Sequence, residues 1–340
     1  MIIHNEDQLE DALSRPSEAD KAALRELDGD LLILGAGGKM GPSLARRARR
    51  AADEAGARKR IIGVARFSTP ELRERLEGWG VETIAADLLA PEQLALLPEV
   101  PNVIFMAARK FGSTGNEPLT WAMNTYLPAL VAERYRASRI VAFSSGNVYP
   151  LVPVLEGGCT ESVPPDPVGE YGQSVLGRER MFQYFSAQHG TPVTLLRLNY
   201  AVELRYGVIL DIGLKVFENR PVDLRMGHVN VIWQGDANSV CLRSFSLANS
   251  PPEILNLTGP ETIAVRWIAR RFGEIFGVEP KLEGTESPTA LLNNAARCHR
   301  LFGHPEVSVE QIIEWVAKWI AAGGELLNKP THFEVRDGKF

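Results

Sequence analysis

Glycines near the N-terminus have the spacing of a phosphate-binding loop. Gly35, Gly38 and Gly41 form a G-x-x-G-x-x-G pattern, with Lys39 and Met40 inside it. Glycine permits a tight turn, lets backbone N–H groups approach a pyrophosphate, and lets a helix pack closely on a strand. A short apolar run precedes the loop and a proline opens the helical stretch after it, so the positive end of a helix dipole faces the loop. The pattern predicts dinucleotide binding, with a purely structural turn as the alternative.

The end of the second apolar run bears on which dinucleotide binds. Ala65 stands near the place where an acidic residue would hold the ribose hydroxyls of the adenosine half. Arg66 and Ser68 instead offer donors for a 2′-phosphate, with Lys39 as a helper. These residues favour NADP slightly over NAD. The alternative is that Arg66 is a solvated side chain and that NAD binds without this contact.

The third apolar run closes with two further candidates for cofactor binding, Asp87 and Leu88. Asp87 is placed to accept a hydrogen bond from the adenine amino group. Its alternative role is to cap the helix that follows. We therefore predict that Asp87 and Leu88 lie at the adenine end of the site.

Length, charge and cysteine content narrow the classes to which the chain can belong. Its 340 residues include 45% hydrophobic and 23% charged residues, which is the ordinary globular range, and its net charge is -5. An acidic chain lacks the basic footprint of a nucleic-acid-binding protein, and no apolar run approaches the ~18 residues of a membrane span. The three cysteines lie too far apart for a disulfide framework or a zinc site, and we expect no metal. The prediction is a cytoplasmic globular protein that binds neither nucleic acid nor membrane.

Apolar runs alternate with helical stretches through the first two thirds of the chain. This rhythm predicts right-handed crossovers and a doubly wound, parallel α/β sheet of the Rossmann type. The helical stretches that separate the runs include 44–57, 118–137 and 168–188. The predicted strands cover 31–34, 61–64, 81–86, 103–107, 140–144 and 193–198.

The alternation loosens after residue 200, which suggests a smaller C-terminal α/β lobe for the substrate. We therefore divide the chain into an N-terminal helical extension (1–28), a dinucleotide-binding domain (29–200), a mainly substrate-binding lobe (201–330) and a tail (331–340). Some segments of the lobe are expected to return to the Rossmann sheet. The last helix is predicted to begin at Ser308, with Gln311 completing a capping box.

Residues at later strand ends resemble those of a known family. Ala107 and Ala108 follow the fourth run, Asn124 lies in the next helix, and Ser145 belongs to a Ser-Ser-x-x-Val-Tyr sequence after the fifth run. With the glycine loop, they resemble the extended short-chain dehydrogenase/reductase family, in its NAD-dependent epimerase/dehydratase branch, over residues 30–325. The resemblance implies that Ala107 and Ala108 lie beside the nicotinamide and that Asn124 contributes to cofactor binding. It also implies that the Ser145 hydroxyl hydrogen-bonds the substrate oxygen.

The family's Tyr-x-x-x-Lys sequence is only half present. Tyr171 matches the tyrosine, but Val175 stands at the lysine position, and the residues downstream keep the helix in register. In the family that lysine binds the nicotinamide ribose and lowers the pKa of the tyrosine, which exchanges a proton with the substrate. A free tyrosine has a pKa of about 10, so without a nearby cation only roughly one molecule in a thousand carries the phenolate near neutral pH.

Lys110 is the candidate replacement for the missing lysine. It follows the fourth strand directly, at the edge where ligands bind in open α/β sheets. A buried lysine can lower the pKa of a neighbour or act itself as acid or base. The alternative is a solvent-facing loop lysine. The sequence around Asn199 also departs from the family's pattern at the place where nucleotide-sugar contacts are usually assigned.

Two functions of different classes follow. The first is an NAD(P)-dependent oxidoreductase or epimerase that acts by hydride transfer on a carbohydrate-like hydroxyl or ketone, with Ser145, Tyr171 and Lys110 as catalytic residues. The second is a dinucleotide-binding protein without redox turnover, serving as a sensor or assembly partner. The resemblance also implies a homodimer, formed through the helices at 118–137 and 168–188. Retention of Ser145 and Tyr171 favours the enzyme, and Val175 favours the alternative.

Overall fold

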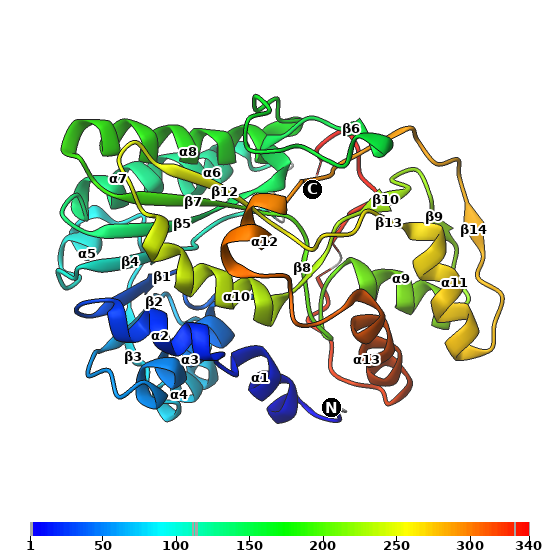
Figure 1. Ribbon diagram of the computed structural model, residues 1–340, viewed down its shortest axis with the longest axis horizontal. Coiled ribbons are helices and arrows are strands. Elements are labelled where there is room, and N and C mark those ends of the chain that lie inside the picture. The colour runs from blue at the N-terminus through cyan, green and yellow to red at the C-terminus, as the bar shows by residue number, and fades with distance from the viewer. Residues whose placement is uncertain (1–2, 111, 113–114, 330, 340) are drawn as a thin grey trace.

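The computed structural model of the protein describes residues 3–110, 112, 115–329 and 331–339. A sheet of seven strands forms its centre, in the order β12-β7-β5-β4-β1-β2-β3 (Figure 1). Every neighbouring pair in this sheet is parallel. The predicted α/β fold with a doubly wound sheet is therefore confirmed. The strands are β1 (Leu31–Leu34), β2 (Ile61–Ala65), β3 (Glu82–Ala85), β4 (Asn102–Phe105), β5 (Arg139–Ser145), β7 (Val193–Leu198) and β12 (Glu253–Leu257).

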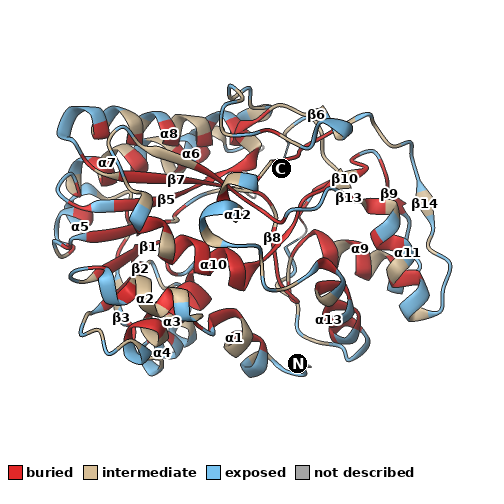
Figure 2. Cartoon of the chain, in the orientation of Figure 1, coloured by how far each residue is buried: buried red, intermediate tan, exposed pale blue. Residues whose placement is uncertain are grey.

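Helices cover both faces of this sheet, because the strands are apolar on both sides (Figure 2). One face is covered by α5 (Pro91–Ala95), α7 (Leu127–Arg134) and α8 (Gly169–His189). The other face is covered by α2 (Glu18–Glu26), α3 (Gly41–Glu54), α4 (Pro70–Gly78) and α10 (Gln234–Arg243). The strand order reverses between β1 and β4, which is where open α/β sheets bind ligands.

The stretch predicted as one helix over 118–137 consists of three consecutive segments. These are α6 (Glu117–Trp121), the π-helical turn η1 (Ala122–Tyr126) and α7. A π turn within an α-helix often marks a functional site. Here it carries Asn124, which is fully buried.

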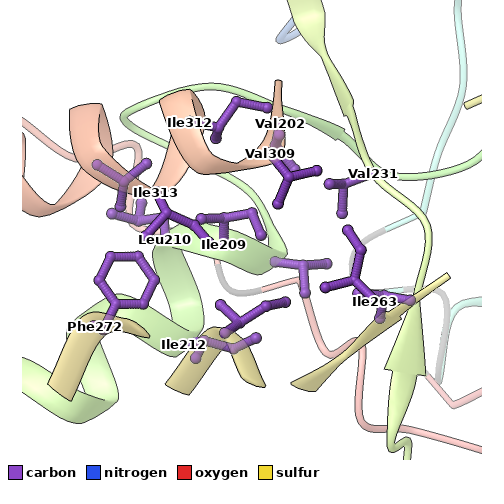
Figure 3. Packing of buried hydrophobic residues seen from close by; sticks show 14 of the residues in the cluster. Val202, Ile209, Leu210, Ile212, Val231, Ile263, Phe272, Val309, Ile312 and Ile313 are labelled. Atoms are coloured by element: carbon purple, nitrogen blue, oxygen red, sulfur yellow. The ribbon is translucent and has the colours of Figure 1, made fainter. Parts of the chain in front are cut away.

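The remaining residues form a smaller lobe with its own apolar core (Figure 3). The core joins Ile209 and Ile212 of α9 (Val208–Phe217) to Phe272 of α11 (Val265–Phe276) and Ile313 of α13 (Val309–Ala321). The Ser308 side chain caps α13 by accepting from the Gln311 backbone N–H. The short elements of this part are β6 (Val152–Pro153), β8 (Ala201–Val202), β9 (Val222–Asp223), β10 (His228–Val229), β11 (Ile232–Trp233), β13 (Ile263–Ala264), β14 (Leu282–Glu283), β15 (Thr289–Ala290) and α12 (Ala296–Phe302).

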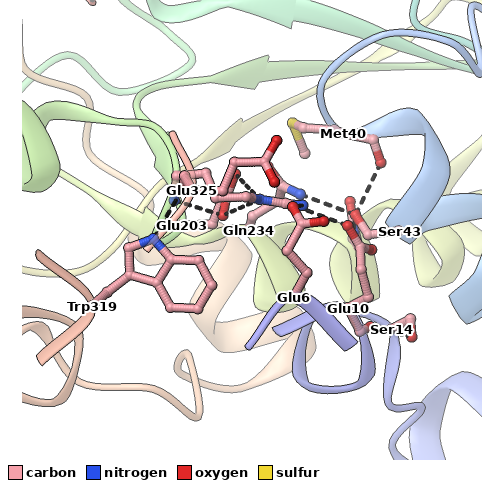
Figure 4. A network of polar contacts seen from close by, with 11 residues as sticks. Glu6, Glu10, Ser14, Met40, Ser43, Glu203, Gln234, Trp319 and Glu325 are labelled. Atoms are coloured by element: carbon pink, nitrogen blue, oxygen red, sulfur yellow. Dashed lines mark hydrogen bonds and ion pairs between the residues drawn. The ribbon is translucent and has the colours of Figure 1, made fainter. Parts of the chain in front are cut away.

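The N-terminal helices tie the sheet to the lobe. In α1 (Glu6–Ser14), Glu6 and Glu10 each accept a hydrogen bond from Arg205 of the lobe at 2.9 Å. Arg205 also contacts Glu203, and Figure 4 shows these carboxylates gathered between α1 and the lobe. In α2, Asp20 receives two hydrogen bonds from Arg47 of α3, at 2.6 and 2.8 Å. The extension is thus packed into the molecule through buried ion pairs.

Candidate active site

The glycine loop lies between β1 and α3, with its glycines at the points of closest backbone approach. Gly35 has a φ of 98°, and a Cβ there would come within 2.6 Å of the Ala107 backbone nitrogen at the end of β4. A Cβ on Gly41 would overlap the Ala36 carbonyl. No side chain caps the first turn of α3, since Met40 precedes it and Pro42 opens it. Its N–H groups and the positive end of its dipole are therefore suited to an anion such as a pyrophosphate.

A cavity of about 380 Å³ opens at the carboxyl ends of β1, β4 and β5. Half of the predicted site residues meet there. The cavity is lined by the predicted residues Gly38, Lys39, Met40, Ala108, Lys110, Ser145 and Tyr171. This edge of the sheet is the one that the strand-order reversal predicts for a ligand.

The residues predicted for the adenosine end lie outside this cavity lining. Arg66 is exposed at the end of β2, and Leu88 is buried. One carboxylate oxygen of Asp87 accepts from the Leu89 backbone N–H at 3.0 Å, which closes a local turn, whereas no side chain caps the following helix α5, so the alternative helix-cap role is not found. Cofactor contacts by these three residues stay a prediction.

Lys39 bonds residues other than Arg66, and its help with a 2′-phosphate stays a prediction. Its ammonium donates to the Ala201 carbonyl at 2.9 Å and lies 3.6 Å from the centre of the Tyr206 ring. A carbonyl and an aromatic face are both favourable partners for a cation, and together they hold Lys39 in the cavity, toward the lobe. Burial lowers the pKa of Lys39, and the nearby Glu203 carboxylate opposes this shift.

The side chain of buried Asn124 connects two segments that border the cavity. Its Oδ1 accepts from the Arg109 backbone N–H at 2.9 Å and from Arg178 at 3.0 Å. Its Nδ2 donates to the Arg109 carbonyl at 2.8 Å and to the Ser174 hydroxyl at 3.0 Å. These four bonds join the loop after β4 to helix α8. The predicted contact of Asn124 with the cofactor stays a prediction.

Ser145 and Tyr171 form a pair at the cavity wall. Ser145 ends β5, where its hydroxyl accepts from the Asn147 backbone N–H at 3.1 Å, and Tyr171 lies in the first turn of α8. Burial raises the pKa of Tyr171 above its ordinary 10, while the positive charge of Arg178 and a hydrogen bond with Ser145 act against this rise. The pair offers one hydroxyl to hold an oxygen and a second to exchange a proton.

Lys110 faces the same space. Its ammonium lies 5.8 Å from the centre of the Tyr171 ring and 6.0 Å from that of Tyr200. Burial lowers its pKa from 10.5 to about 8. Lys110 is thus placed in the cavity rather than in solvent, and its lowered pKa lies just above physiological pH.

The sequence analysis missed several residues of the lining. Tyr206 and Thr331 come from the lobe and the C-terminal segment, and Tyr200 adopts a left-handed backbone with a φ of 43°. No local pattern marks these three residues. Arg178 also lines the cavity. Its spacing of seven residues from Tyr171 places both residues on one face of the same helix, and this spacing could have identified it from the sequence.

Comparison with known proteins adds to this geometry. A family model described as the NAD dependent epimerase/dehydratase family matches residues 31–202, half of the chain. The chain belongs to this family. No curated protein matches the sequence of this chain. None of the helices in the part of the chain that the structure describes has the length and apolar character needed to cross a bilayer.

Solved structures share the fold of this family member at low sequence identity. UDP-glucuronic acid 4-epimerase from Bacillus cereus, solved with NAD, has a TM-score of 0.71 and 17% identity, covering 86% of this chain and 98% of that chain. UDP-glucose 4-epimerase from Thermotoga maritima, solved with UDP-glucose, gives 0.69 and 16%, with coverage of 86% and 99%. UDP-glucose 4-epimerase from Thermus thermophilus, solved with NAD, gives 0.69 and 18%, with coverage of 85% and 97%. These similarities establish the shared fold.

Proposed function

We propose that this protein is a nicotinamide-dependent oxidoreductase of the epimerase or dehydratase kind, acting on a hydroxyl or ketone of a carbohydrate-like molecule. Family membership supports the class of reaction. The observation that carries the proposal is the position of Ser145 and Tyr171 together in the lining of the cavity that begins at the glycine loop. Hydride transfer at a carbinol carbon needs a group that holds the oxygen and a group that exchanges its proton.

The residues of the loop fit a dinucleotide. Side chains at Gly35 or Gly41 would collide with backbone atoms of Ala107 or Ala36, so only glycine leaves the backbone amides free to approach a pyrophosphate. Gly38, Lys39 and Met40 would line the part of the cavity next to it. When bound in its oxidised form, the nicotinamide supplies the acceptor for the hydride and its electron pair. The solved structures with NAD on the same fold support this cofactor class.

Residues of the protein would bind the substrate oxygen and exchange its proton. The Ser145 hydroxyl would donate a hydrogen bond to the substrate oxygen, and Tyr171 as phenolate would accept the proton of the substrate hydroxyl. Lys110, close to both Tyr171 and Tyr200, would bind the same oxygen or an acidic group of the substrate. In the reverse direction Tyr171 returns its proton to the carbonyl oxygen as the hydride comes back.

A slight preference for NADP over NAD is part of the proposal. It depends on Arg66, which is exposed at the end of β2 and therefore accessible to a 2′-phosphate. Ala65 beside it carries no charge that would repel the phosphate. The solved structures named above hold NAD, so this preference needs its own measurement.

A homodimer through α6, α7 and α8 is also proposed. Leu127, Val131 and Phe182 on these helices are fully buried against their own sheet and are not available to a partner. Exposed aromatic residues on α6, η1 and α8 support an interface instead, namely Trp121, Tyr126 and Tyr184. Light scattering at micromolar concentration should give twice the mass of the chain, and a monomeric mass would remove the dimer from the proposal.

Turnover measurements on variants test the proposed function. Dinucleotide released from the denatured protein is identified by mass spectrometry, and sugars, sugar acids and nucleotide-sugars are screened for reduction of NAD or NADP. On the substrate found, Tyr171→Phe should lower kcat by about 100-fold or more, the usual contribution of a general acid–base group. Ser145→Ala and Lys110→Met should lower it as well. All three should leave dinucleotide affinity within a few-fold.

Arg180→Gln is the matched control, because Arg180 is an exposed side chain on the same helix. It should leave turnover unchanged. If Tyr171→Phe and Ser145→Ala also leave turnover unchanged, the pair has no part in the reaction. If dinucleotide binds tightly and no tested substrate is turned over, the result favours the dinucleotide-binding protein without redox activity.

A further inference from the structure

Arg178 is a buried cation on the helix that carries Tyr171. It lies two turns after Tyr171 and one turn after Val175, so the three residues share a face of α8. Long side chains on a helix lean toward its N-terminus, which carries the guanidinium of Arg178 back over Val175 in the direction of Tyr171. Arg178 is only 2% exposed and lines the same cavity as Tyr171.

Neutral acceptors hold this guanidinium. One amino group donates to the Phe143 carbonyl at 2.6 Å, and the other donates to Oδ1 of Asn124 at 3.0 Å. Its Nε is buried and has no hydrogen-bond partner among the described residues. Glu179, the nearest carboxylate in sequence, forms two bonds with Arg197 instead, at 2.7 and 2.9 Å.

A buried charge without a carboxylate bonded to it is costly to keep. Across the part of the chain that the structure describes, no carboxylate hydrogen-bonds Arg178. The charges of Tyr171 and Glu179 act on its positive charge through space without a bond to it. Burial lowers the pKa of Arg178 to about 10, so the side chain remains protonated at neutral pH.

Several elements contribute polar or charged groups around the Tyr171 hydroxyl. Ser145 comes from β5, Lys110 from the loop after β4, and Tyr206 from the lobe. Lys39 of the glycine loop also lines the cavity, where the charge of Lys110 contributes to lowering the pKa of Lys39. Of the cations here, Arg178 is the one whose charge lowers the pKa of Tyr171.

We propose that Arg178 is the positioning residue that replaces the missing lysine, with its guanidinium stabilising the phenolate of Tyr171 from one helical turn beyond Val175. The proposal rests on the proposed function, in that Tyr171 is the group that exchanges the proton. When Tyr171 as phenolate accepts a proton from the substrate hydroxyl, it becomes a neutral phenol, and Arg178 keeps its charge throughout. Val175, fully buried beside Tyr171, leaves the space over this turn to the longer side chain.

The test is a tyrosinate titration by ultraviolet absorbance, which needs neither substrate nor cofactor. The titration of each protein is compared with that of the same protein carrying Tyr171→Phe, so that the difference reports Tyr171 alone. Removing an opposite charge from a buried site raises such a pKa by about 1 to 3 pH units. We expect this rise in Arg178→Gln, and we expect Arg178→Lys to titrate close to the wild type.

Arg180→Gln is the matched control, because Arg180 is an exposed arginine on the same helix that bonds only Gln183 among the described residues. It should leave the titration of Tyr171 unchanged. The double variant Val175→Lys with Arg178→Gln moves the cation back by one turn and should restore part of the lost effect. If Arg178→Gln does not fold, Arg178→Met takes its place in both comparisons, because methionine keeps a long side chain without the charge.

An unchanged titration of Tyr171 in Arg178→Gln would overturn the proposal, and so would a double variant that restores nothing. On an active substrate, the pH at which kcat/KM reaches half its maximum should rise in Arg178→Gln together with the pKa of Tyr171. A wild type that turns over no substrate would count against the proposed function alone, since the titration would still report on Arg178.

Discussion

The two sides of the cavity are built on different physical grounds. At the glycine loop, the site is formed by backbone atoms. Its glycines are required because a Cβ at Gly35 or Gly41 would collide with neighbouring backbone atoms. Along α8 the site is made of side chains, and its chemistry depends on which charges face Tyr171. The loop keeps the family's pattern at each of its glycines. The helix loses one cation at Val175 and holds another at Arg178.

The difference teaches which parts of a site can be rearranged. A backbone cradle has few alternatives, because the clash is with atoms that every residue carries. A positive charge near a phenol can come from any neighbouring position whose side chain reaches it. The predictions that follow set buried against exposed charges, and backbone against side-chain contributions.

The largest effect is expected where a buried charge on the α8 side loses its partner. Arg197 and Glu179 are almost fully buried and form a two-point ion pair at 2.7 and 2.9 Å. Arg197→Met leaves the Glu179 carboxylate without its cation and should lower the free energy of unfolding by about 3–5 kcal/mol. Urea denaturation measures this change. Arg73→Met removes an exposed ion pair with Glu77 and should cost less than about 1 kcal/mol; equal losses in the two variants would contradict this contrast.

On the loop side, Gly41→Val should weaken dinucleotide binding by about 100-fold or more. The new side chain overlaps the Ala36 carbonyl, so the loop must shift away from the position that lets backbone N–H groups meet the phosphates. Calorimetric titration measures the affinity. Gly78→Ala is the control, since a Cβ there meets no atom within 4 Å. A Gly41→Val protein that binds dinucleotide as the wild type does would refute the backbone cradle.

Lys110 should make stability depend on pH in a defined window. Burial lowers its pKa from 10.5 to about 8. Between these values the unfolded chain holds the proton more often than the folded protein, so folding becomes more favourable as the pH rises. Below pH 8 both states carry the charge, and the penalty of burying it is fully present.

Denaturation of the wild type and of Lys110→Met across this window checks the expectation. The wild type should gain stability relative to Lys110→Met as the pH rises from 8 to 10.5. Lys318→Met, which changes an exposed lysine of α13, should show no such relative change. A constant difference between wild type and Lys110→Met would mean that Lys110 keeps its charge hydrated.

The smallest effect is expected at the adenosine end, where one exposed side chain acts alone. Arg66→Ala should lower the affinity for NADP several-fold and leave that for NAD unchanged, because an exposed ion pair contributes at most about 1 kcal/mol. Parallel titrations with both dinucleotides measure the ratio. Equal affinities in the wild type, or tighter binding of NAD, would remove the NADP preference.

The sequence predicted those features that local chemistry determines. Each apolar run from 31–34 to 193–198 forms a strand of the sheet, and Ser308 caps the last helix, because period, capping and turn residues act over a few positions. The position of Lys110 at this cavity followed from the rule that ligands bind at the carboxyl edge of parallel strands, and Ser145 and Tyr171 were expected there from the family resemblance.

Features that depend on distant contacts were not accessible in the same way. The direction of Lys39 depends on the Ala201 carbonyl and the Tyr206 ring, which are far away in sequence. The split of one helix into α6, η1 and α7 follows from tertiary packing, which overrides local propensity. Within the described part of the chain, Arg178 has no bonded carboxylate because Glu179 pairs with Arg197 instead. This pairing depends on the fold and not on the local sequence.

A crystal structure of the protein with bound dinucleotide tests the central claim most directly. The account predicts the pyrophosphate on the backbone of the loop at 35–41 and the nicotinamide in the cavity beside Ser145 and Tyr171, with Arg178 still directed at Tyr171. A dinucleotide bound elsewhere, or a nicotinamide turned away from the Ser145–Tyr171 pair, would contradict the proposal that this cavity is a redox site.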